Sequence, residues 1–79
     1  MIELKVRVFA TLRRHLEGYD GEEILIEMSE NATVSDVLEY LSIPDREVKQ
    51  VFVDNRKATV ETMLNDGARV SIFPPIAGG

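Results

Sequence analysis

The strongest constraint on the fold is the segment 33–42, where apolar residues recur with the period of an α-helix. Thr33 can cap the first turn, and Asp36, three residues later, completes a capping box. Pro44 cannot continue a helix, so we predict a helix over 34–42. The residues of its apolar face, at positions i, i+3, i+4 and i+7, are Val34, Val37, Leu38 and Leu41.

The chain before this helix alternates with the two-residue period of β-strands. Residues 2–9 place Ile2, Leu4, Val6 and Val8 on one face and Glu3, Lys5, Arg7 and Phe9 on the other. Residues 10–18 predict one or two helical turns that end at Gly18. Alternation returns through Ile24, Ile26 and Met28, which predicts a second strand antiparallel to the first.

Three further strands are predicted after the helix. Residues 51–53 form a short β-rich run, and Asp54-Asn55 then suits a hairpin turn that leads into a weaker strand. A turn at 65–67 precedes the last strand, in which Val70 and Ile72 face the core. The side chains predicted on the opposite face of that strand are Arg69, Ser71 and Phe73.

This order of elements predicts an α+β domain in which one helix packs across a mixed sheet of four to five strands. The β-grasp architecture has this arrangement, and we take the strand order from that analogy. A chain of 79 residues has room for one compact core. We therefore expect a single domain over 1–73, followed by an extended tail over 74–79.

Composition excludes several classes of function. The chain has no cysteine, and its single His15 has no second imidazole or thiol beside it in sequence, so we expect no metal and place His15 on the surface. Asp20, Glu22 and Glu23 do not have EF-hand spacing. No run approaches the ~20 apolar residues of a membrane span, which favours a cytoplasmic protein. A net charge of −5 with scattered Lys and Arg argues against nucleic acid and favours a basic protein partner.

The sequence ends on "FPPIAGG", in which each residue type suggests a role. Pro74 and Pro75 fix φ and donate no backbone hydrogen bond, so the chain must leave the sheet as a stiff arm. Gly78 and Gly79 carry no side chain and could enter a slot too narrow for a Cβ. We expect Phe73 to anchor a partner at the base of this arm, and Ile76 and Ala77 to give it a hydrophobic grip. Phe9 and Leu25 also lie opposite the core, which suggests an outer apolar patch.

Three stretches of the chain resemble the ubiquitin-like sulfur carriers of the MoaD/ThiS family: "VRVFATLRRHLEG", "ATVSDVLEYL" and, most specifically, "LNDGARVSIFPPIAGG". The resemblance covers essentially all of the chain and is strongest to the small subunit of molybdopterin synthase, because that subunit's tail typically has two prolines. The chain departs from the family pattern at Asp54-Asn55 and at Asp66-Gly67-Ala68, both of which are turn positions.

The resemblance implies that Gly79 is the reactive residue. An adenylating enzyme of the ubiquitin-activating type would use ATP to activate its carboxylate, and a sulfur donor protein would convert it to a thiocarboxylate. The large subunit of the synthase would then supply the catalytic groups, usually in a heterotetramer, while the small chain binds no cofactor of its own. Three alternatives remain open: a carrier for thiamine, cysteine or tRNA thiolation, a protein modifier acting through Gly79, and an interaction domain with an inert tail.

Overall fold

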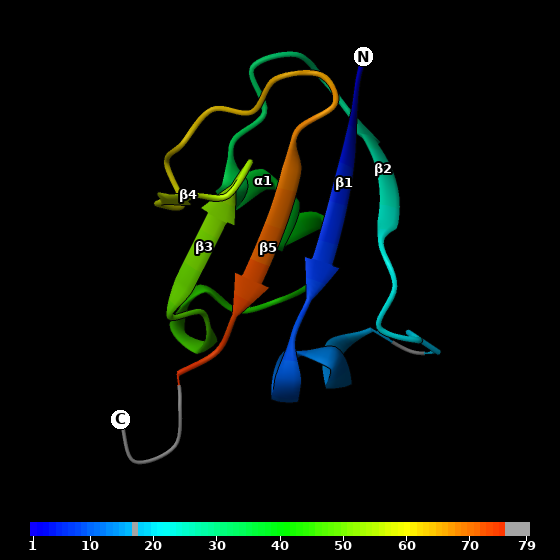
Figure 1. Ribbon diagram of the computed structural model, residues 1–79, viewed down its shortest axis with the longest axis vertical. Coiled ribbons are helices and arrows are strands. Elements are labelled where there is room, and N and C mark those ends of the chain that lie inside the picture. Colours follow the sequence, from blue (N-terminus) through cyan, green and yellow to red (C-terminus); the bar gives the residue numbers. More distant parts are fainter. Residues whose placement is uncertain (17, 76–79) are drawn as a thin grey trace.

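The computed structural model describes residues 1–16 and 18–75, and its five strands form one mixed sheet with the helix α1 across one face (Figure 1). In Figure 1 the sheet is seen from its uncovered face, and α1 lies behind it. The two 3₁₀ helices lie in connections at the end of the sheet where β5 finishes. The elements in chain order are β1 Ile2–Val8, η1 Ala10–His15, β2 Ile24–Met28, α1 Val34–Tyr40, η2 Asp45–Glu47, β3 Gln50–Val53, β4 Arg56–Ala58 and β5 Arg69–Phe73.

The strand order is β2-β1-β5-β3-β4, with the first and last strands adjacent at the centre. β1 and β5 are parallel, with Val6 opposite Val70 and Val8 opposite Ile72, whereas the other three pairings are antiparallel. Parallel strands need a long crossover connection, and here that connection contains α1. The predicted β-grasp fold is therefore confirmed, including its mixed sheet and the antiparallel pairing of β1 with β2.

The core lies between α1 and the covered face of the sheet. Strand parity places the predicted apolar residues there: Leu4, Val6 and Ile72 have no exposed surface, and Leu38 of α1 is 1% exposed. The 3₁₀ helix η1 adds Leu12, which is also 1% exposed. None of the described polar or charged residues is buried. The alternation of the strands thus separates the apolar core residues from an outer face that carries most of the charged residues of these strands.

Helix α1 begins as predicted but ends two residues earlier. The capping box is present, because Asp36 N–H donates to Thr33 Oγ1 and Thr33 N–H donates to Asp36 Oδ2. At the other end Ser42 has a φ of +60°, and Ile43 N–H donates to Leu38 O at 2.9 Å. This left-handed residue ends the helix in a Schellman motif before Pro44 is reached, so the predicted end at Ser42 is wrong.

The turn at Asp54-Asn55 connects β3 to β4 as predicted. Both residues have positive φ, 52° and 69°, which is the geometry of a type I′ hairpin turn. Asp54 also accepts a hydrogen bond from Arg69 N–H at 3.1 Å, so the turn is tied to the start of β5. The hairpin is therefore fixed both by its own backbone and by the neighbouring central strand.

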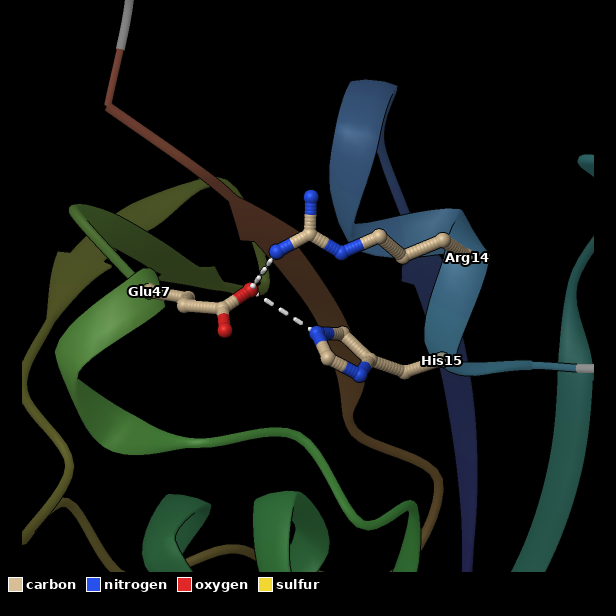
Figure 2. A network of polar contacts seen from close by, with 3 residues as sticks. All are labelled: Arg14, His15 and Glu47. Carbon is tan, nitrogen blue, oxygen red and sulfur yellow. Dashed lines mark hydrogen bonds and ion pairs between the residues drawn. The ribbon is translucent and has the colours of Figure 1, made fainter.

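Three side chains join η1 to η2 across the end of β5 (Figure 2). Arg14 Nη2 and His15 Nε2 both lie 2.8 Å from Glu47 Oε1, and we call this group the clasp. Because an ionised carboxylate only accepts hydrogen bonds, both nitrogens donate. His15 lies on η1 as expected, but its side chain is only 20% exposed, so its placement as a surface residue is corrected to half-buried.

The clasp lowers the pKa of Glu47. The hydrogen bond from His15 is the main cause, and the positive charge of Arg14 acts in the same direction against the opposing effect of desolvation. The ionised carboxylate is therefore favoured in the folded chain relative to its ordinary pKa of 4.5. The clasp thus links the two connections beside β5 through a charge that depends on pH.

The left-handed conformation of Ser42 predicts that glycine is better at this position. We expect Ser42→Gly to raise the free energy of unfolding by about 1 kcal/mol, because a Cβ is unfavourable at positive φ. The matched control is Glu39→Gly, on the exposed side of α1, which should lower the free energy of unfolding by roughly 0.5 kcal/mol. Urea denaturation measures both variants, and a loss of stability in Ser42→Gly would contradict the assignment.

The clasp predicts a stability that falls with acid. Since the folded pKa of Glu47 is lowered, its contribution is complete above the ordinary carboxyl pKa of 4.5 and is lost as pH falls through the folded value. We expect Glu47→Gln to be less stable than the wild type at neutral pH and to lose less stability between about pH 5 and pH 3. Urea denaturation across this range tests it, with Asp45→Asn on the same 3₁₀ helix as the control. If the free energy of unfolding depended equally weakly on pH in both variants, a specific role for Glu47 would be contradicted.

Candidate functional site

The base of the predicted tail is held at both sides of β5. Phe9 N–H donates to Ile72 O at 3.1 Å on the β1 side, and Lys49 N–H donates to Phe73 O at 2.8 Å on the β3 side. Pro74 follows at once and has no N–H to extend the ladder. The strand therefore ends at Phe73, as predicted, and residues 72–75 form what we call the tail root.

Only part of the predicted site lies within the described residues. Phe73 and Pro74 are half-buried and Pro75 is exposed, while Ile76, Ala77, Gly78 and Gly79 lie outside the described residues. The expected reactivity of Gly79 and the expected grip by Ile76 and Ala77 stay predictions. The described residues nevertheless show the surface from which the tail departs.

Three aromatic rings gather on the uncovered face of the sheet at the tail root. The rings of Phe9 and Phe73 are stacked with centroids 4.4 Å apart and planes inclined by 8°. Phe52 meets Phe73 edge-on, with centroids 5.8 Å apart. The prediction that Phe73 points away from the core is confirmed. We call Phe9, Phe52 and Phe73 the aromatic cluster.

The aromatic cluster both supports and modifies the expected outer patch. Phe9 contributes to it as predicted, whereas Leu25, 64% exposed, stands on β2 opposite Lys5. The sequence pattern alone indicates no site role for Phe52, although its place between the inward-facing Val51 and Val53 is a signal of outward orientation. Its proximity to Phe73 depends on the pairing of β3 with β5, which alternation alone does not fix.

A second group missed from sequence lies beside these rings. Arg7 is opposite Ser71, Ser71 is opposite Phe52, and Phe52 is opposite Lys57, so these side chains form one row across four strands. Cross-strand neighbours point to the same face of a sheet. The next row contains Arg69 opposite Lys5. We call Lys5, Arg7, Lys57 and Arg69 the basic cluster.

The aromatic cluster and the basic cluster are in contact. The Arg7 guanidinium lies 5.9 Å from the centroid of the Phe9 ring, within reach of a cation–π interaction. Arg69 Nε lies 3.8 Å from Glu23 Oε2 at the far side of the basic cluster.

Across residues 1–16 and 18–75, no three His, Cys, Asp or Glu side chains are placed to share a metal ion. In the same residues no helix has the length and apolar character to cross a membrane.

The chain is similar to several known proteins along its whole length. It is 37% identical over 95 residues to small archaeal modifier protein 3 of Haloferax volcanii, covering 99% of this chain and 100% of the relative. A Pyrococcus furiosus protein described as molybdopterin converting factor subunit 1 is 27% identical, with a TM-score of 0.74 over 96% of this chain and 100% of that chain.

A third similar structure is a complex of subunits 1 and 2 of the molybdopterin-converting factor from Helicobacter pylori. The matched chain is 19% identical, with a TM-score of 0.62 over 99% of this chain and 100% of that chain, and this likeness shows a common fold. The sequence model of the ThiS family matches residues 6–79, which include the predicted tail through its last glycine. With its β-grasp fold and this match over nearly the whole sequence, the chain belongs to the ThiS family of ubiquitin-like proteins.

Proposed function

We propose that this protein is a sulfur carrier whose last residue, Gly79, is adenylated and converted to a thiocarboxylate. The observation that carries the proposal is that the family match continues through Gly79. The last matched residues, 74–79, follow directly after β5, which ends at Phe73. The two prolines and the two glycines suit an arm that projects from a rigid body. Partner proteins bind the folded domain and thereby position these last residues.

The proposed chemistry needs an activated carboxylate. A Gly79 carboxylate oxygen attacks the α-phosphorus of ATP, pyrophosphate leaves, and an acyl-adenylate forms on the adenylating enzyme. A hydrosulfide ion supplied by a donor protein then attacks the acyl carbon and forms the carbon–sulfur bond, the carbon–oxygen bond to AMP breaks, and AMP leaves as the thiocarboxylate releases a proton. The carrier contributes the acyl group, while the partner proteins contribute the catalytic groups.

We further propose molybdenum cofactor biosynthesis as the destination of this sulfur, with the chain as the small subunit of molybdopterin synthase. Pro74-Pro75 supports this assignment, as does the similarity to the P. furiosus subunit 1 protein. The H. pylori neighbour was solved in complex with a subunit 2, which supports a second synthase subunit as the partner here. A large subunit in a heterotetramer is what the family resemblance implies for that partner. Carriage of sulfur for thiamine, cysteine or tRNA thiolation would use the same activated glycine.

A second candidate function is covalent modification of other proteins. The 37% identity to a small archaeal modifier protein favours it. The chemistry shares its first step, since a lysine amine could attack the same acyl-adenylate or an ester derived from it and form an isopeptide bond. The two functions differ in the nucleophile that finally takes the Gly79 acyl group.

Intact-mass analysis of the protein isolated from its native host separates these functions. A carrier should appear as free chain in which one carboxylate oxygen is exchanged for sulfur, whereas a modifier should appear as conjugates of higher mass. A variant with one alanine added after Gly79 serves as the control and should show neither product. An unmodified carboxylate under all growth conditions, together with no adenylation by the host's activating enzyme, would contradict both functions.

The aromatic cluster predicts a measurable loss of partner affinity on truncation of Phe73. Buried aromatic anchors typically contribute about 2 kcal/mol or more to an interface, so we expect Phe73→Ala to weaken binding to the activating enzyme roughly thirtyfold. Isothermal titration calorimetry measures the dissociation constant. Tyr40→Ala, which removes a ring 62% exposed on α1, is the matched control and should bind normally. Circular dichroism checks that both variants are folded, and equal affinities would remove Phe73 from the interface.

A further inference from the structure

The uncovered face of the sheet changes in character along the strands. The outward residues of β1 are Glu3, Lys5 and Arg7, and Phe9 follows the strand directly, so the face runs from acidic through basic to aromatic toward the tail root. β5 runs parallel to β1 and repeats the order from Arg69 to Phe73. The basic cluster therefore occupies the middle of the face, next to the aromatic cluster.

This local charge is opposite to the charge of the whole protein. The chain carries 14 Asp and Glu against 9 Lys and Arg, yet four of those nine cations are the basic cluster. Arg7, Lys57 and Arg69 are exposed and Lys5 is half-buried. Within the described residues, the ion pair recorded for these four side chains is the long 3.8 Å contact of Arg69 with Glu23. Most of the cationic hydrogen-bonding capacity on this face is thus available to a partner.

We propose that this face docks an acidic protein surface that also presents an apolar side chain to the aromatic cluster. The inference rests on the proposed function, because it names the chemistry of the partner surface that holds the tail root. Charge complementarity steers association and excludes wrong partners, while a desolvated aromatic contact supplies affinity. It replaces the basic partner expected from net charge with an acidic one, because the basic cluster lies on the sheet face that also carries Phe73 at the tail root.

The geometry favours a protein over a phosphate polymer. A hollow in this face is lined by residues that include Lys5, Arg7 and Arg69 together with Glu23. Glu3 and Glu27 stand opposite each other at the far end of the same face, so a long anionic strand that crosses it would meet like charge. The Phe9 and Phe73 rings are stacked on each other, which leaves them less free to stack on successive bases. A compact acidic patch matches the limited extent of the basic cluster.

Nuclear magnetic resonance titration of the full chain tests this docking face directly. The probe is a synthetic peptide of alternating Asp and Glu around one Phe, and the comparison ligands are the same peptide with Lys at the acidic positions, a DNA duplex and anionic lipid vesicles. We expect the acidic peptide to shift amide signals of β1, β3 and β5 near the two clusters, with little response in α1. Stronger binding of the basic peptide, or tighter binding of DNA or vesicles at this face, would overturn the proposal.

Charge-reversal variants make the test specific to these side chains. Arg7→Glu combined with Lys57→Glu should weaken binding of the acidic peptide at least tenfold and reduce its dependence on salt. Arg46→Glu, an exposed cation on η2, is the matched control and should bind within about twofold of the wild type. Equal losses in the two proteins would show a general effect of net charge and would overturn the proposal.

A second measurement separates this inference from the proposed function. The KM for adenylation by the host's activating enzyme should rise at least tenfold in the Arg7→Glu, Lys57→Glu protein and remain unchanged in Arg46→Glu. Absence of adenylation in the wild type would count against the sulfur-carrier function, while the peptide titration would still decide the docking face. A wild-type KM in the double variant, together with wild-type affinity for the acidic peptide, would reject the docking face. The proposed carrier function would be unaffected by that result.

Discussion

The parallel pairing of β1 with β5 is the constraint on which the rest of the structure depends. It places the first and last strands at the centre of the sheet, and it requires a crossover that brings α1 over one face. Their apolar side chains, including Val6 and Ile72, form the middle of the core. Because both strands point the same way, the connection after β1 and the tail root emerge side by side.

This shared end gives the tail root its surroundings. Backbone hydrogen bonds from Phe9 and Lys49 hold the last residues of β5, and the clasp joins the two flanking connections across the strand (Figure 2). On the uncovered face, the aromatic cluster adds packing around Phe73. Several independent contacts therefore hold Ile72 and Phe73, the residues directly before the two prolines.

The distribution of charge matters more for recognition than its total. A net charge of −5 describes the long-range field of the protein, whereas a partner that reaches the tail root meets Arg7, Lys57 and their neighbours at short range. Dissolved salt limits the range over which exposed charges interact to about 10 Å at moderate ionic strength. The charges close to the contact therefore control docking more than the net charge does. The same face can thus be cationic on a protein that is acidic overall.

The strands and the helix could be predicted from sequence because the patterns that indicate them, side-chain alternation and helix capping, involve residues only a few positions apart. Two-residue alternation gave the inward and outward faces of β1 and β5, and the capping box at Thr33 and Asp36 gave the start of α1. The end of α1 was harder, since a serine rather than the usual glycine adopts the left-handed conformation at Ser42. For the site, alternation was enough to point Phe73 outward, but no local signal joined it to Phe52.

Sequence by itself determined which residues face inward and where the strand before Pro74 and Pro75 must end. These properties follow from backbone chemistry and side-chain period, which act over a few residues. Only the tertiary structure decided that Arg14 and His15 would meet Glu47 and that Phe9, Phe52 and Phe73 would share one face with four cations. Such contacts join residues tens of positions apart, and strand order and register, not local preference, bring them together.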